Sequence, residues 1–244
     1  MIRISKKLIK RFPTIDLVTL ESFSDEHQKR FYRRLESGSE GVDLGRNGIT
    51  FLLCSLQRSK ILYNGLVQCL NNPAVTLAYL ALRAHMETTG SVAYFLKKLR
   101  QYYEGDFSFE EMDDTLYRLI LGRRVYPNDH STVKPHPINV LTLVDAVDNA
   151  FSKMAKSSDW KRFREAYEWL SEFCHPNCFG QTIGVEMSFP KAIFEEEPEF
   201  REYDVSQINS YMIISCELFF DFYDKCFSLV EEHEEMPKLI KVSS

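Results

Sequence analysis

Two short segments of the chain combine side chains that could bind an anion or exchange a proton. The first contains Arg83, His85 and Glu87. On a helix, residues four apart share a face, so Arg83 and Glu87 lie together while His85 points elsewhere. Arg83 could hold an anion at the base of a cleft, or it could pair with Glu87 and join two helices. The residue types allow both interpretations.

The second segment contains His175 and Asn177, where a predicted helix ends before Pro176. Imidazole gains or loses a proton near neutral pH, and the C-terminus of a helix favours its charged form. Asn177 and Gly180 suit a turn that would display the ring. His175 could therefore act as a proton donor or acceptor, or could cap the last carbonyls of its helix.

A zinc site would use Cys174, His175 and Cys178. Structural zinc commonly takes four ligands from two separated pairs. The second pair is missing here, so we expect no metal and no cofactor.

A third group, Arg123, Arg124 and His130, lies in a proline-containing stretch with His136 close behind. Basic and imidazole side chains in one loop could contact a nucleic-acid phosphate backbone. A polar surface loop has the same composition, so this segment also allows two interpretations.

Several enzyme classes are excluded because their motifs are absent. The sequence contains no GxxxxGK[ST], GxGxxG, HExxH, EF-hand loop or GxSxG. A P-loop ATPase, a Rossmann dehydrogenase, a kinase or a zincin would each require one of these patterns.

Hydrophobic periodicity predicts the helices that position these residues. Two long helices joined at Pro73 would form an antiparallel hairpin, and Ser108 with Glu111 has the spacing of a capping box. Helices are expected over about 49–70, 74–103, 109–121, 139–156, 160–174 and 204–233, with shorter elements at 15–23 and 25–35. Glycines at 38–48 and prolines at 123–137 predict loops.

Residues 181–194 instead suggest a short hairpin or extended excursion before the last helix. The sequence thus predicts an all-α protein, an antiparallel bundle of about six or seven helices with one such insertion. We expect an N-terminal arm or small helical annex at 1–46, the bundle at 47–234 and a tail at 235–244.

Composition favours a soluble protein of one large domain. The chain has 244 residues with a net charge of −5, and its acidic excess lies after residue 180. No secretory signal opens the chain, none of the six cysteines forms a CxxC pair, and the apolar stretch at 205–216 is too short for a membrane span. We expect a cytoplasmic location without membrane association.

The chain resembles the HEPN-like superfamily of helical bundles, and most closely its bacterial members of unassigned function. The resemblance covers about 48–232 and rests on LRAHMET at 82–88, YEWLSEFCHPN at 167–177, the excursion at 181–194 and the final apolar helix. Active members are metal-independent endoribonucleases of toxin–antitoxin, abortive-infection and antiviral systems, with sites typically completed across a homodimer.

The superfamily signature is an Arg followed, after four to six residues, by a His on a helix. Glu168, Trp169 and Leu170 occupy the matching positions before His175, and the Arg124–His130 pair lies in a loop. The resemblance therefore implies a site in which Arg83 steadies phosphate charge and reaches His175 through space, with His85, Glu87 and Asn177 around them.

Three functions remain open on this sequence. One is a HEPN-type ribonuclease or toxin acting on RNA, with an antitoxin as partner. Another is a non-catalytic helical module for dimerisation or protein binding, in which Arg83 and Glu87 pair and His175 caps its helix. The third is small-molecule binding within the bundle.

Overall fold

A computed structural model describes residues 3–36, 43–122, 135–155, 162–196 and 198–241. These residues form nine helices and four short strands. The elements are α1 Lys6–Arg11, α2 Leu17–Arg30, β1 Arg34–Glu36, α3 Leu44–Asn71, α4 Val75–Tyr103, α5 Phe109–Leu121, α6 Val140–Ala155, α7 Arg162–Cys174, α8 Cys178–Gln181, β2 Val185–Ser188, β3 Lys191–Phe194, α9 Glu202–His233 and β4 Lys238–Ile240. The predicted all-α character is confirmed.

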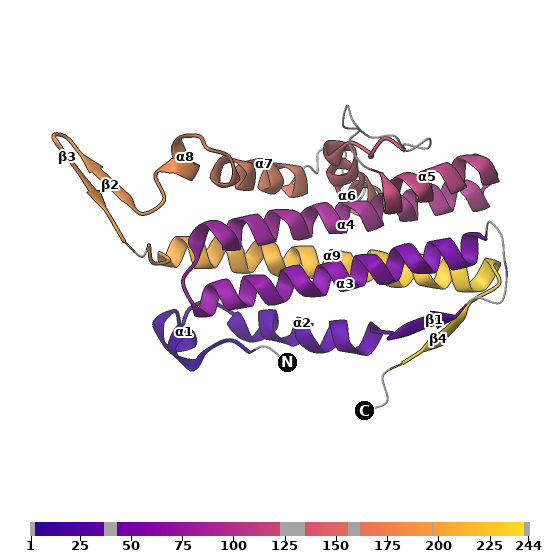
Figure 1. The fold of residues 1–244 in the computed structure, drawn as a ribbon, viewed down its shortest axis with the longest axis horizontal. Coiled ribbons are helices and arrows are strands. Elements are labelled where there is room, and N and C mark those ends of the chain that lie inside the picture. The colour runs from indigo at the N-terminus through magenta and orange to yellow at the C-terminus, as the bar shows by residue number, and fades with distance from the viewer. Residues whose placement is uncertain (1–2, 37–42, 123–134, 156–161, 197, 242–244) are drawn as a thin grey trace, which may run out of the picture.

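Helix α4 is the centre of the bundle and packs against α3, α5, α6, α7 and α9. Figure 1 shows α3, α4 and α9 running alongside one another, with α1 and α2 on one side and α5, α6 and α7 on the other. In the described ranges, no helix is both long enough and apolar enough to cross a bilayer.

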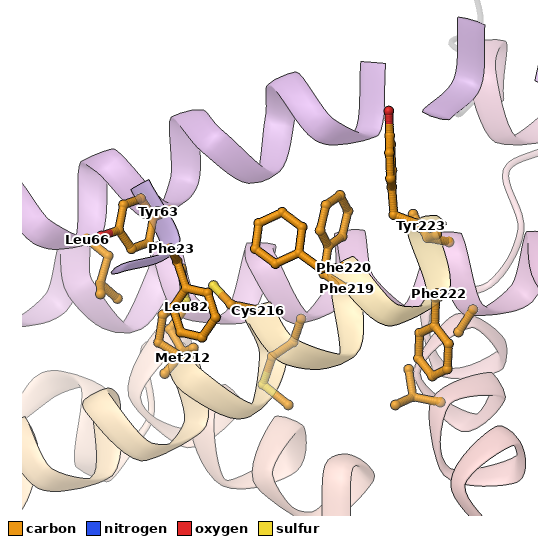
Figure 2. Close-up of a cluster of buried hydrophobic side chains, with 14 of the residues drawn as sticks. Phe23, Tyr63, Leu66, Leu82, Met212, Cys216, Phe219, Phe220, Phe222 and Tyr223 are labelled. Atoms are coloured by element: carbon orange, nitrogen blue, oxygen red, sulfur yellow. The ribbon is translucent and has the colours of Figure 1, made fainter. Parts of the chain in front are cut away.

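The core lies where α2, α3, α4 and α9 meet. Figure 2 shows Phe220 and Phe222 pointing to opposite sides of α9. The last helix is therefore apolar on more than one side. Phe219 and Phe220 meet edge to face with centroids 5.5 Å apart, a favoured aromatic geometry.

The N-terminal residues pack on this core. The hydroxyl of Tyr63 donates to the carbonyl of Leu20 at 2.8 Å, and Arg30 binds Asp224 of α9 through two hydrogen bonds of 2.7 and 2.8 Å. Strand β1 pairs antiparallel with β4, so the segment after α2 and the segment after α9 form a small sheet.

Two local expectations differ from the structure. Helix α3 begins at Leu44, inside the predicted glycine loop, because Asp43 caps it by accepting the Gly45 N–H at 2.9 Å. The two predicted elements at 15–23 and 25–35 are instead α2 followed by β1. Strand β1 is held by its hydrogen-bonded pairing with β4, which is far away in the chain. No pattern in the neighbouring residues therefore predicts this strand.

Capping side chains account for the starts of α5 and α7. Ser108 and Glu111 form the predicted capping box of α5. Ser158 and Asp159, whose residue types could cap the helix expected over 160–174, lie outside the described residues. Asp148 of α6 accepts the N–H groups of α7 residues 163 and 164 at 3.1 and 2.9 Å.

Two glycines inside long helices predict opposite effects of the same substitution. A Cβ on Gly65 would meet nothing within 4 Å, whereas one on Gly90 would lie 2.7 Å from the Leu143 carbonyl oxygen. Gly65→Ala should stabilise the fold by about 0.5–1 kcal/mol, and Gly90→Ala should destabilise it by about 1–3 kcal/mol. Urea denaturation measures both, and equal effects would contradict the close α4–α6 packing.

Candidate functional site

Arg83 and Glu87 lie on one face of α4, and Tyr167 of α7 connects them. The Tyr167 hydroxyl accepts from Arg83 Nη2 at 2.8 Å and donates to Glu87 Oε1 at 2.9 Å. The direct Arg83–Glu87 separation is longer, at 3.8 Å. The Arg83 guanidinium also covers the Tyr167 ring, 5.0 Å from its centroid, which is a cation–π distance. All three side chains are thus held in one cluster between α4 and α7.

Burial keeps the hydroxyl of Tyr167 protonated. Burial, and then the hydrogen bond to Glu87, raise the pKa of Tyr167 to about 12, so its hydroxyl remains a donor. Burial also raises the pKa of the Cys174 thiol, and the neighbouring Arg83 opposes that rise. Arg83 Nε is buried and has no hydrogen-bond partner in the part of the chain that the structure describes.

The end of α7 presents His175 to solvent. Its backbone N–H donates to the Ser171 carbonyl at 3.1 Å, and its side chain is exposed. His175 directly follows Cys174, which touches Arg83, but no hydrogen bond joins His175 to Arg83 among the described residues.

Asn177 has a structural task at this turn. Its side-chain oxygen accepts the Gly180 N–H at 3.1 Å, and its amide donates to Glu172 Oε2 at 2.8 Å. It is the N-cap of α8, a role that asparagine fills well.

His85 lies apart from the other candidate residues. It is completely buried between α3 and α9, as its place on another face of α4 requires. His85 Nε2 contacts Ser59 Oγ and its Nδ1 contacts Ser215 Oγ, each at 2.8 Å. Ser59 Oγ also contacts Nε2 of the buried His27 at 2.9 Å, so both imidazoles share one network.

With neutral imidazoles, the Phe23 carbonyl fixes the hydrogen positions from His27 to Ser215. His27 Nδ1 faces the Phe23 carbonyl at 2.7 Å, so it carries the proton, and Nε2 accepts from Ser59. Ser59 has then used its only hydrogen and must accept from His85 Nε2. His85 Nδ1 consequently accepts from Ser215, whose hydroxyl also lies 3.0 Å from that of Thr89.

Burial favours the neutral form of both histidines in the folded protein. Burial lowers the pKa of His27 to about 4 and that of His85 to about 3. In this arrangement a second proton on His27 Nε2 or on His85 Nδ1 would point at a hydroxyl hydrogen that already points at that nitrogen. The network ties α2, α3, α4 and α9 together.

Of the four basic and histidine candidates in the stretch from Arg123 to His136, the structure describes one. Arg123, Arg124 and His130 lie outside the described residues. The carbonyl of His136 accepts from Arg118 at 3.0 Å. Within the described ranges, no group of three or more His, Cys, Asp or Glu side chains could hold a metal ion.

Tyr167 is the residue of the Arg83 cluster that the sequence analysis missed. Its signal was present, because Tyr167, Leu170 and Cys174 recur at helical spacing along one face of α7. His27 was missed similarly, although it follows Leu20 and Phe23 along the buried face of α2.

Removing the Tyr167 hydroxyl should measure what the cluster contributes. Tyr167→Phe leaves Arg83 and Glu87 half-buried without their bridge, so we expect a loss of about 1–3 kcal/mol in the free energy of unfolding. Tyr203→Phe is the control, since Tyr203 is 61% exposed. Equal urea midpoints for both variants would contradict the bridging role.

A different surface is formed by the β2–β3 hairpin, which Figure 1 shows projecting beyond the end of the bundle. Cross-strand partners share a face of a two-stranded sheet. One face therefore carries Val185, Met187, Ala192 and Phe194, all apolar. Met187 is 73% exposed and Phe194 75%, while Phe189 at the turn is fully exposed. Val185 is half-buried, and the described chain leaves the Met187, Ala192 and Phe194 part of this face exposed.

A groove of about 700 Å³ lies between α7 and α9. Its walls are mostly apolar and aromatic, and they also carry charged side chains of both signs, Arg162, Glu165 and Glu217. The lining includes Met86, Phe163, Glu165, Trp169, Tyr203, Tyr211, Ile214, Glu217 and Leu218. We call this the α7–α9 groove.

Comparisons with protein-family models, with curated proteins and with solved structures find no match for this chain. The class that the fold and surface define is an all-α bundle with a projecting amphipathic hairpin.

Proposed function

We propose that the protein is a non-enzymatic helical interaction module whose binding element is the β2–β3 hairpin. The observation that carries this proposal is the apolar hairpin face on which Met187, Ala192 and Phe194 are exposed. Burying apolar surface is favourable by about 25 cal/mol per Å², so a hairpin held out in water gains free energy by binding a partner. A two-stranded hairpin is also only marginally stable alone, and a partner would hold its strands in place.

The arrangement of the ionisable side chains supports a non-catalytic role. Arg83 and Glu87 are both hydrogen-bonded to Tyr167, and His85 is bonded at both ring nitrogens within the core. Each of these groups thus has a structural use in the bundle.

The partner in this proposal is a protein, either a second copy of the chain or a different one. All six cysteines are unpaired, which suits a reducing compartment, and we place the protein in the cytoplasm on that ground.

A hairpin variant tests the proposal. Met187→Ser, Phe194→Ser and Phe189→Ser together replace three exposed side chains, so we expect an unchanged free energy of unfolding. Immobilised wild-type protein should retain soluble wild-type protein or a defined partner from its own cells, and the variant should retain at least tenfold less.

The matched control is Ile61→Ser with Leu77→Ser, which removes apolar side chains that are 57% and 58% exposed on α3 and α4. This control should retain the same protein as the wild type. Retention by the hairpin variant equal to that of the control would contradict the proposal.

A second candidate function is a HEPN-like, metal-independent ribonuclease. It is favoured by the unpartnered Nε of Arg83 and by the position of the exposed His175 directly after Cys174, which touches that arginine. The imidazole would serve as proton donor or acceptor for a ribose hydroxyl, and Arg83 would hold the phosphate.

The assay for this second candidate is cleavage of total tRNA and mRNA in EDTA, with expression toxicity scored in parallel. Cleavage that is lost in His175→Ala and Arg83→Ala would establish it. Absence of both cleavage and toxicity in the wild type would eliminate it.

A further inference from the structure

Three aromatic rings meet in one part of the α7–α9 groove. Trp169 of α7 contacts Tyr203 and Tyr211 of α9, with ring centroids 6.5 and 5.7 Å away and ring planes inclined by 78° and 64°. Trp169 and Tyr211 are half-buried, and Tyr203 is exposed. Rings at steep angles to one another can each turn a face toward the same point, and aromatic cages bind quaternary ammonium groups in this way.

No cation of the described chain already occupies these rings. Elsewhere in the bundle, Arg83 covers the ring of Tyr167 and Lys98 covers that of Phe107. Among the residues that the structure describes, no Lys or Arg side chain lies over any of the three groove rings. Their faces are thus open to a cation that binds from solution.

A carboxylate accompanies the rings. Glu165 lies four residues before Trp169, so the two share a face of α7. Burial, then Tyr203 and then the Glu165 carboxylate raise the pKa of Tyr211, so this negative charge acts on the same side of the groove. Within the described ranges, Glu165 forms no ion pair. A cation among the rings would supply the missing opposite charge.

The other part of the groove is apolar and carries charges of both signs. Figure 1 shows α7 and α9 running in opposite directions, so Glu217 of α9 lies toward the start of α7, where Arg162 is. Arg162 lies two turns before Trp169, about 10 Å along the helix, and has an interaction partner of its own. The apolar lining includes Met86, Phe163, Ile214 and Leu218.

We propose that the α7–α9 groove binds a small amphiphilic molecule with a quaternary ammonium head and an apolar chain. The head lies against the three rings beside Glu165, and the chain lies along the apolar lining. A quaternary ammonium has no hydrogen to donate, so ring faces and a nearby negative charge suit it better than hydrogen-bond acceptors do. The groove volume of about 700 Å³ is in the range of small-molecule sites. This site is separate from the β2–β3 hairpin and goes beyond the proposed function.

Isothermal titration calorimetry with octyltrimethylammonium, kept below its micelle concentration, tests the inference on the full chain. Octyl sulfate has the same apolar chain with the opposite charge, and octyl glucoside has it with no charge. The wild type should bind the ammonium compound at least tenfold more tightly than either of the others, because only its head is attracted by the rings and by Glu165.

Variants at exposed positions locate the site without changing the core. Glu165→Gln and Tyr203→Leu should each weaken binding of octyltrimethylammonium roughly threefold or more. The matched control is Glu231→Gln, which removes an exposed charge farther along α9 and should bind as the wild type does. The inference is overturned if the wild type does not bind the cation, if it binds all three compounds equally, or if the groove variants bind as tightly as the control.

Discussion

Lowering the pH from 7 to 4 is expected to remove roughly 6 kcal/mol from the free energy of unfolding. His27 and His85 are neutral in the folded state, with pKa values lowered by burial to about 4 and about 3. In the unfolded chain both titrate near 6.5. Between these values the unfolded state binds more protons, so stability is fully present above pH 6.5 and is lost as the pH falls.

The expected slope is large because two groups act together. Each histidine removes about 1.4 kcal/mol per pH unit below its unfolded pKa, so the pair removes roughly 3 kcal/mol per unit between pH 6 and 4. The total of roughly 6 kcal/mol would bring a domain at the low end of the usual 5–15 kcal/mol to its unfolding midpoint near pH 4.

Urea denaturation at pH 7, 6, 5 and 4 measures this slope. The surface variant His233→Gln is the control and should keep the wild-type slope, since that side chain is 42% exposed. A free energy of unfolding that stays constant from pH 6.5 to 4 would show that the imidazoles are not buried in the neutral form.

Ser59→Ala should be the most destabilising removal of a single hydroxyl in the molecule. Ser59 donates to His27 Nε2 and accepts from His85 Nε2, so its loss leaves His27 Nε2 without a partner and His85 Nε2 with only the Cys216 sulfur at 3.8 Å. An unsatisfied buried polar group costs about 1–3 kcal/mol, so the two weakened positions together predict a loss of about 2–5 kcal/mol.

The matched control is Ser91→Ala on α4. The Ser91 hydroxyl donates to the Glu87 carbonyl of its own helix at 3.0 Å, and that carbonyl also lies within the helical ladder. Its removal should cost less than about 1 kcal/mol. Equal losses for the two serine variants, measured in urea, would contradict the network.

Local patterns in the sequence predict the long helices well. The α3–α4 hairpin, the capping box of α5 and the end of α7 at Cys174 all follow from periodicity, Pro positions and cap residues. Each of these features is decided by residues close together in the chain. The pairing of β1 with β4 joins residues about two hundred positions apart, and nothing near Arg34 indicates it.

In the candidate site, as in the fold, the sequence predicts what neighbouring residues decide and misses what packing between helices decides. The i,i+4 relation of Arg83 and Glu87 correctly predicts one shared face of α4. The Tyr167 bridge and the Ser59–His85 contact depend on how α7 and α3 pack against α4, which spacing along one helix cannot determine. The sequence predicts a hairpin or extended segment at 181–194. Which side chains share the apolar face of the β2–β3 hairpin follows only from the strand register in the structure.

Hydrogen exchange at residues 185–194 is the most direct test of a binding role for the hairpin. We predict that, as the concentration of the wild-type protein or of its partner rises, these amides exchange at least tenfold more slowly while those of α5 are unchanged. Hairpin amides that exchange equally fast with and without the partner, at every concentration, would contradict the account.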